Sequence, residues 1–155
     1  MSSEWRYVAE LENAGLPLVR FGIWLKPNGA PNFSGDRPGT GWEAIVILHG
    51  EGKKHWNGGG HHAVWICNPE RGDHPTQKPL PLLLDWVKKF TDEGDTVLDP
   101  FMGSGTTGVA CLKLGRSFIG IERREDYFNT ARARMEAAHA QRDLFAPTYI
   151  REPLL

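Results

Sequence analysis

Apolar positions recur along this chain in two rhythms. Where they recur at helical spacing or follow a glycine turn, helices are predicted, at residues 3–13, 80–90, 109–114 and 125–141. Short runs rich in Val, Ile, Leu and Trp predict strands at residues 18–25, 42–48, 63–67, 96–98 and 117–122. The alternation of strands and helices predicts an α/β fold, with a single domain over residues 1–145 and a tail over residues 146–155.

A glycine-rich turn follows the strand predicted at residues 96–98. Gly103, Gly105 and Gly108 let the backbone turn tightly before the helix predicted at residues 109–114. Such a strand, turn and helix point free backbone N–H groups and the positive end of a helix dipole at a ligand. The sequence therefore predicts that an anionic or strongly polar cofactor binds here.

The same three glycines satisfy the dinucleotide-binding pattern G-x-G-x-x-G, so a nucleotide-linked oxidoreductase using NAD is one alternative. In a dinucleotide site the strand runs directly into the first glycine, whereas residues 99–102, Asp-Pro-Phe-Met, intervene here. The Asp99 carboxylate would repel a pyrophosphate, but it would attract an ammonium group or accept a hydrogen bond from a hydroxyl. We therefore expect a cationic or zwitterionic cofactor.

Residues 99–107, Asp-Pro-Phe-Met-Gly-Ser-Gly-Thr-Thr, resemble the S-adenosylmethionine-binding signature of the amino-methyltransferases that modify adenine or cytosine in DNA. Residues 74–79, His-Pro-Thr-Gln-Lys-Pro, are similar to the family's second cofactor segment, which precedes the glycine turn in the permuted branch. The resemblance implies a Rossmann-like methyltransferase sheet with helices on both faces and S-adenosylmethionine as cofactor. The cofactor-binding residues that it implies are Thr76, Gln77, Lys78, Asp99, Pro100, Phe101, Gly103, Ser104, Gly105 and Thr106.

Glu122 ends the strand predicted after the glycine turn. It follows that turn at roughly the 20-residue spacing where an acidic residue binds the ribose hydroxyls in nucleotide-binding sheets. A lone acidic residue at a strand end is more often a surface cap, but the position behind this turn favours ribose binding. The resemblance implies the same role for Glu122.

Four side chains are candidates for contacts with DNA. Lys26 lies in residues 22–28, a segment that is similar to one following the catalytic loop in the family, and a short glycine-rich loop contains Lys53, Lys54 and Trp56. Lysine side chains can bind phosphate, and a tryptophan ring can stack on a base. The net charge of −1 does not favour a nucleic-acid binder, so a basic face would require the charges to be segregated.

The family's catalytic signature, a tetrapeptide of the Asp-Pro-Pro-Tyr or Ser-Pro-Pro-Trp type, does not occur in this sequence. No catalytic residue is therefore assigned. In the permuted order, the catalytic loop and its strand precede the helix predicted at residues 3–13. We therefore expect a domain truncated at its amino end, which lacks the central strand beside residues 96–98. Without that strand, the two halves of the sheet share no hydrogen-bond ladder and expose an apolar edge.

Such a chain is expected to pair with a complementary chain that carries the catalytic loop, to dimerise through the open edge, to close the gap by direct strand pairing, or to be marginally stable. The resemblance covers nearly all of this chain but only the carboxyl-terminal half of the enzyme. The first hypothesis is the cofactor half of a DNA methyltransferase, active only with a second chain or an upstream segment. The alternative is an inactive cofactor-binding accessory protein or the remnant of a truncated gene.

Composition excludes several other classes. A chain of 155 residues with 40% hydrophobic and 24% charged residues is ordinary for one globular domain. Two cysteines are too few for a disulfide framework, and neither a signal peptide nor a membrane-spanning run is visible, so we expect a cytoplasmic protein without membrane contact. No metal site is predicted, because no recognised zinc spacing links His55, His61, His62 and Cys67.

Overall fold

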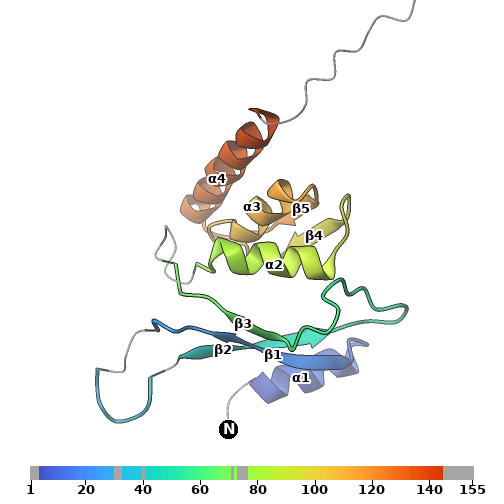
Figure 1. Ribbon diagram of the computed structural model, residues 1–155, viewed down its shortest axis with the longest axis vertical. Coiled ribbons are helices and arrows are strands. Elements are labelled where there is room, and N and C mark those ends of the chain that lie inside the picture. Colours follow the sequence, from blue (N-terminus) through green and yellow to red (C-terminus); the bar gives the residue numbers. More distant parts are fainter. Residues whose placement is uncertain (1–3, 30–32, 40, 71, 73–76, 145–155) are drawn as a thin grey trace, which may run out of the picture.

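The computed structural model describes residues 4–29, 33–39, 41–70, 72 and 77–144 (Figure 1). Its helices are α1 (Glu4–Asn13), α2 (Leu80–Phe90), α3 (Thr106–Lys113) and α4 (Glu125–Leu144). Its strands are β1 (Leu18–Leu25), β2 (Trp42–Leu48), β3 (Val64–Ile66), β4 (Thr96–Asp99) and β5 (Ser117–Gly120). The predicted α/β class is confirmed, and each predicted element is present. The elements at residues 18–25, 42–48 and 80–90 have the predicted bounds, and the others have shifted ends. The predicted tail and Thr76 lie outside the described residues.

The strands form two separate sheets instead of one. The first has the order β2-β1-β3, in which β1 pairs antiparallel with β2 and parallel with β3, and the second is the parallel pair β4-β5. Among the described residues, no hydrogen-bond ladder joins the two sheets. The predicted separation of the two halves is therefore confirmed, and direct pairing of the remaining strands, one of the expected alternatives, does not occur there.

One hydrophobic core joins the two sheets, and α2 lies at its centre. In Figure 1, α2 lies between the three-stranded sheet below it and the two-stranded sheet above it. The core cluster is made of buried residues from the three-stranded sheet and the residue before β3, from α2 and from α3: Trp24, Ala63, Trp65, Leu82, Leu83, Val87, Ala110 and Cys111. Val97 of β4 and Phe118 of β5 pack against the same cluster. The contact between the two halves is therefore made by side chains instead of by strand pairing.

Two indole N–H groups of this core have hydrogen-bond partners. The indole Nε1 of Trp24 donates to the carbonyl oxygen of Cys67 at 2.8 Å, and that of Trp65 donates to Oδ2 of Asp85 at 2.7 Å. Burial raises the pKa of the Cys111 thiol to about 11, so this cysteine behaves as a small apolar side chain. The indole Nε1 of Trp86, which packs against the same core, is buried and has no hydrogen-bond partner among the described residues.

The opposite face of the two sheets is apolar and largely uncovered by the described residues. Side chains alternate between the two faces of a strand, and the exposed ones include Ile23, Leu25, Val64, Ile66, Leu98, Ile119 and Ile121. In Figure 1, α1 and α2 lie on opposite sides of the three-stranded sheet, in agreement with the prediction of helices on both faces. The seven exposed side chains, Ile23, Leu25, Val64, Ile66, Leu98, Ile119 and Ile121, are called the open face below.

Candidate functional site

The glycine turn links β4 to α3 at the carboxyl end of the two-stranded sheet. Asp99 is the last residue of β4; its Oδ1 accepts a hydrogen bond from the N–H of Phe101 at 3.0 Å, and its Oδ2 accepts one from the hydroxyl of Thr107 at 2.7 Å. These two bonds hold the turn closed. Because an ionised carboxylate offers about four acceptor positions, Asp99 retains acceptor capacity for a ligand.

Two glycines of the turn are required for close packing. Gly105 has a φ of +74°, and a Cβ atom at this position would lie 2.8 Å from the Cβ of Ala131 in α4. A Cβ on Gly108 would lie 2.3 Å from the sulfur of Met135 and 2.8 Å from the ring of Phe118. The G-x-G-x-x-G spacing thus lets α3 approach α4 and β5 closely.

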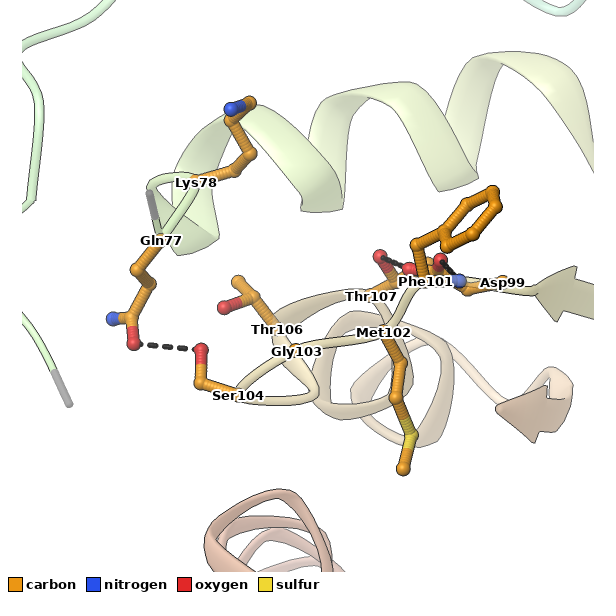
Figure 2. A pocket seen from close by; sticks show the side chains of 9 residues that line it. All are labelled: Gln77, Lys78, Asp99, Phe101, Met102, Gly103, Ser104, Thr106 and Thr107. Atoms are coloured by element: carbon orange, nitrogen blue, oxygen red, sulfur yellow. Dashed lines mark hydrogen bonds between the residues drawn. The ribbon is translucent and has the colours of Figure 1, made fainter. Parts of the chain in front are cut away.

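A cavity of about 190 Å³ lies between the glycine turn and the segment that enters α2 (Figure 2). Its walls bring together seven of the predicted cofactor residues: Gln77, Lys78, Asp99, Phe101, Gly103, Ser104 and Thr106. Pro100 and Gly105 belong to the same turn without lining the cavity. Met102 and Thr107 line it and were missed, although a threonine at the second position of a helix that follows a strand-end carboxylate is a recognisable partner for that carboxylate.

The segment before α2 is tied to the glycine turn by side-chain hydrogen bonds. The buried hydroxyl of Ser104 donates to Oε1 of Gln77 at 2.8 Å, and the same oxygen accepts from Nη1 of Arg134 at 3.2 Å. Figure 2 shows Gln77 and Ser104 at one end of the cavity and Asp99 and Phe101 at the other. Arg134 was not predicted, although its position three residues after the inward-facing Ala131 of α4 could have suggested it.

Lys78 connects the cavity to the three-stranded sheet. Its ammonium group lies 3.2 Å from a carboxylate oxygen of Glu43, and the other carboxylate oxygen lies 2.5 Å from the ammonium of Lys26. Both ammonium groups lie over the ring of Trp24, at 5.8 Å for Lys78 and 4.9 Å for Lys26. Burial alone would raise the pKa of the Glu43 carboxyl, but the two lysines outweigh it and lower that pKa from its ordinary value.

Phe101 is the most exposed apolar side chain of the turn, with 88% of its surface accessible. A phenylalanine normally buries its ring in a core or an interface. Here the ring stands at the rim of the cavity (Figure 2). It is therefore placed to contact a ligand or another polypeptide.

Glu122 follows β5, and its carboxylate is hydrogen-bonded to the backbone of the glycine turn. Its Oε2 accepts a hydrogen bond from the N–H of Gly103 at 3.1 Å, and its Oε1 accepts one from the N–H of Arg124 at 2.8 Å. Glu122 is not among the residues that line the cavity. The structure brings it to the glycine turn as predicted, and ribose binding stays a prediction.

The four candidate DNA contacts do not lie together. Lys26 lies beside Lys78, near the cavity, whereas the ring of Trp56 packs against Phe90 at the end of α2, with 5.0 Å between ring centroids. Lys54 and Trp56 line a separate cavity of about 430 Å³, and Lys53 belongs to the same loop. Because α2 separates these two groups along its length, a DNA surface near Lys26 would not include Trp56. DNA binding by any of them stays a prediction.

The sequence predicts neither a metal site nor a membrane-spanning segment. Among the described residues, no three His, Cys, Asp or Glu side chains are grouped as metal ligands. None of the described helices is long and apolar enough to cross a bilayer. The absence of a metal and the cytoplasmic location remain predictions.

Comparisons with known proteins agree on one family. A family model described as DNA methylase matches residues 4–133. The type II methyltransferase M2.DpnII of Streptococcus pneumoniae is 38% identical over 145 residues, covering 82% of this chain and 54% of its own length. The type II methyltransferase M.XycI of Xanthomonas campestris pv. cyanopsidis is 32% identical over 154 residues, covering 90% of this chain and 51% of its own length. The chain thus spans about half the length of these curated relatives.

Solved structures give the same result. The crystal structure of an M1.HpyAVI–SAM complex, 34% identical in sequence, covers 87% of this chain and 71% of that protein with a TM-score of 0.75. The cytosine-N4-specific PvuII DNA methyltransferase, at 17% identity, covers 89% of this chain and 62% of its own chain with a TM-score of 0.73, which indicates a shared fold. The Rossmann-like methyltransferase fold predicted from the sequence is therefore confirmed.

Proposed function

This chain belongs to the DNA methylase family, and from this premise we propose that its glycine turn binds S-adenosylmethionine for methyl transfer to an exocyclic amino group of adenine or cytosine in DNA. The observation that carries the proposal is the cavity between residues 77–78 and the glycine turn, with its carboxylate at one end and its amide and hydroxyl groups at the other. Bound there, the cofactor would supply the electrophilic methyl group. This chain's residues would position it.

The chemistry of the cavity fits a zwitterionic ligand. Asp99 offers a carboxylate for an ammonium group, and Ser104 and Thr106 add hydroxyl groups that can both donate and accept. The volume of about 190 Å³ is below the roughly 300–1,000 Å³ that is common for complete small-molecule pockets. The described residues therefore suit the amino-acid part of the cofactor, and we propose that a further polypeptide segment completes the walls around the rest.

Calorimetric titration with S-adenosylhomocysteine tests cofactor binding, with NAD as the comparison ligand. We expect micromolar binding of S-adenosylhomocysteine and none of NAD. Asp99→Ala and Glu122→Ala should each abolish binding, whereas Glu125→Ala, which removes an exposed carboxylate at the start of α4, should leave it unchanged. A folded chain that ignores both ligands would reject the proposal.

We further propose that methylation requires a polypeptide segment carrying the catalytic tetrapeptide, either on a complementary chain or beyond the sequence described here. The separate sheets support this, because among the described residues β3 and β4 each pair on one side only and the open face is apolar. A second copy of this chain is the other candidate for covering these surfaces. Sedimentation of the purified chain distinguishes a homodimer from a monomer that awaits a different partner.

Methyl transfer is tested with radioactive S-adenosylmethionine and unmodified DNA. The gel-filtered chain alone should transfer no methyl group, and adding a polypeptide that carries the catalytic loop should restore transfer. Methylation by the chain alone would show that the segment is dispensable. We place the DNA on the side of Lys26 and Lys78, because both ammonium groups lie near the cavity.

The alternative of an inactive cofactor-binding accessory protein or gene remnant, suggested by the missing tetrapeptide, is not favoured by the comparisons, because the curated relatives are type II methyltransferases. It predicts binding of S-adenosylhomocysteine without restored transfer on addition of the catalytic segment. A nucleotide-linked oxidoreductase is not favoured, because the family match covers the glycine turn and Asp99 occupies the strand end.

A further inference from the structure

The guanidinium of Arg134 in α4 is hydrogen-bonded to residues on two sides of the cavity, the segment before α2 and the glycine turn with the start of α3. Its Nη1 donates to the carbonyl oxygen of Ser104 at 2.6 Å, to Oε1 of Gln77 at 3.2 Å and to the hydroxyl oxygen of Thr106 at 3.3 Å. All three acceptors belong to residues that line the cavity. One guanidinium thus holds together the glycine turn, the first residue of α3 and the segment that enters α2.

The partners of this guanidinium are all neutral. Among the described residues, no carboxylate forms an ion pair with Arg134, and Nη1 alone accounts for its hydrogen bonds. The side chain is half-buried, where a positive charge without a counter-charge is costly. By contrast Arg132, on the same helix, is exposed and lies 3.7 Å from Glu136.

The Asp99 carboxylate lines one end of the cavity, and the positive charge of Arg134 lies behind Gln77 and Ser104 at the other end, without lining the cavity itself. Asp99 is bonded to Thr107 at one end, and Arg134 is bonded to Gln77 and Ser104 at the other. A ligand with an ammonium group near Asp99 and a carboxylate near Gln77 and Ser104 would complement both. A guanidinium in a partly buried site is also a favoured partner for a carboxylate.

We propose that Arg134 is a positioning residue that makes this cavity select ligands bearing a carboxylate at the Gln77 end. This inference rests on the proposed binding of S-adenosylmethionine and assigns the end of the cavity that receives its carboxylate. Arg134 acts by fixing Gln77, Ser104 and Thr106 and by supplying the positive charge behind them. It is a role for a residue outside both sequence motifs.

Ligand binding by the unmodified chain gives the first test. Calorimetry would compare S-adenosylhomocysteine with its decarboxylated derivative and with methylthioadenosine, which lacks the whole amino-acid end. We expect the loss of the carboxylate to weaken binding by about tenfold to a hundredfold, the range of a hydrogen bond to a charged group. Equal affinity for S-adenosylhomocysteine and its decarboxylated derivative would overturn the inference while leaving the proposed function intact.

Variants of Arg134 give the second test. Arg134→Gln should weaken S-adenosylhomocysteine by about tenfold or more and leave methylthioadenosine unchanged, which a general loss of structure would not do. Arg134→Lys, which retains the charge without the planar fork, should restore part of the preference. The matched control Arg132→Gln should alter neither ligand.

The two failures are distinguishable. If the unmodified chain binds none of the three ligands, the proposed function fails and the inference with it. If Arg134→Gln weakens all adenosine ligands equally, Arg134 has only a structural role and the inference is wrong. If Arg134→Gln does not fold, Arg134→Lys and the ligand series on the unmodified chain decide the question.

Discussion

Trp24 and Ile23 are neighbours in β1, yet Trp24 has 2% of its surface exposed and Ile23 has 41%. The same contrast runs through both sheets, with Trp65, Val97 and Phe118 packed towards α2 and α3 and the open face turned away from them. Strands with apolar residues on both faces are typical of sheets that are covered on both sides. The comparison teaches that the strands of this chain carry the pattern of a two-sided sheet, whereas the described residues cover mainly one side.

The largest difference between the two faces should appear with two tryptophans. Trp24→Ala removes a fully buried ring and should lower the free energy of unfolding by about 3–5 kcal/mol, because it leaves a large cavity between β1 and α2. Trp42→Ala removes a ring that is 51% exposed and should cost less than about 1 kcal/mol. Urea denaturation followed by circular dichroism measures both. Equal losses would mean that the two sides are covered alike in solution.

Overpacking on the covered side should give the next largest effect. Gly108→Ala places a methyl group against Met135 and Phe118, and forcing these contacts apart should cost about 1–3 kcal/mol. Gly60→Ala is the matched control, because no atom lies within 4 Å of a Cβ there. Thermal unfolding would compare the two variants. A stable Gly108→Ala chain would indicate that α3 and α4 are not packed closely.

On the open face, single charges should have little effect on the isolated chain. Ile66 is 67% exposed, and Ile66→Lys should change the free energy of unfolding by no more than about 0.5 kcal/mol. The same substitution should prevent association with whatever covers this face, since a buried lysine without a partner is costly. Sedimentation at several protein concentrations measures self-association. A large destabilisation that grows with concentration would indicate that a second copy already covers Ile66.

The smallest effect should come from pH on the covered side. Asp85 is partly desolvated, which alone would raise its pKa, but the ion pair with Lys89 and the hydrogen bond from Trp65 lower it below the ordinary value. A carboxyl whose pKa is lowered on folding contributes stability above its unfolded pKa, and that contribution is lost as the pH falls through the folded pKa. Stability should therefore decline below about pH 4.

Asp85→Asn tests this assignment, because it removes the titrating group and keeps an oxygen for the Trp65 indole. The variant should be less stable than the unmodified chain at pH 7 and should lose less stability between pH 5 and pH 3 (about the range of an ordinary Asp pKa). Parallel pH profiles for the two proteins would assign the acid sensitivity to another group, such as Glu43.

Local sequence signals sufficed for the elements and for much of the candidate site. The strand at β4, the glycines after it and the helix at α3 are contiguous, so residues 99–107 could be identified as a turn that places Asp99, Ser104 and Thr106 together. Gln77 and Lys78 were added through the family resemblance, and the structure places both on the same cavity. The bounds of α3 and α4 differed from the prediction: α3 begins at Thr106, directly after the left-handed Gly105, and α4 extends to Leu144.

Contacts between distant segments were beyond the sequence. Arg134 bonds residues 57 and 30 positions away, and the pairing of Glu43 with both Lys26 and Lys78 joins β2 to the segment before α2. The grouping of Lys26 with Lys53, Lys54 and Trp56 as DNA contacts followed from composition and resemblance, and the structure divides these residues between the two ends of α2. No local pattern in the sequence shows that the loop with Trp56 packs at the carboxyl end of α2 while Lys26 lies near its amino end.

The sequence by itself determined the order of elements, the glycine turn with its strand-end carboxylate, and the absence of the catalytic tetrapeptide, because each of these depends on residues close together in the chain. Only the tertiary structure decided that α2 joins two unpaired sheets through one core, that Arg134 spans the cavity, and that the open face is exposed. These features depend on which side chains meet across the fold, and packing in three dimensions sets that choice.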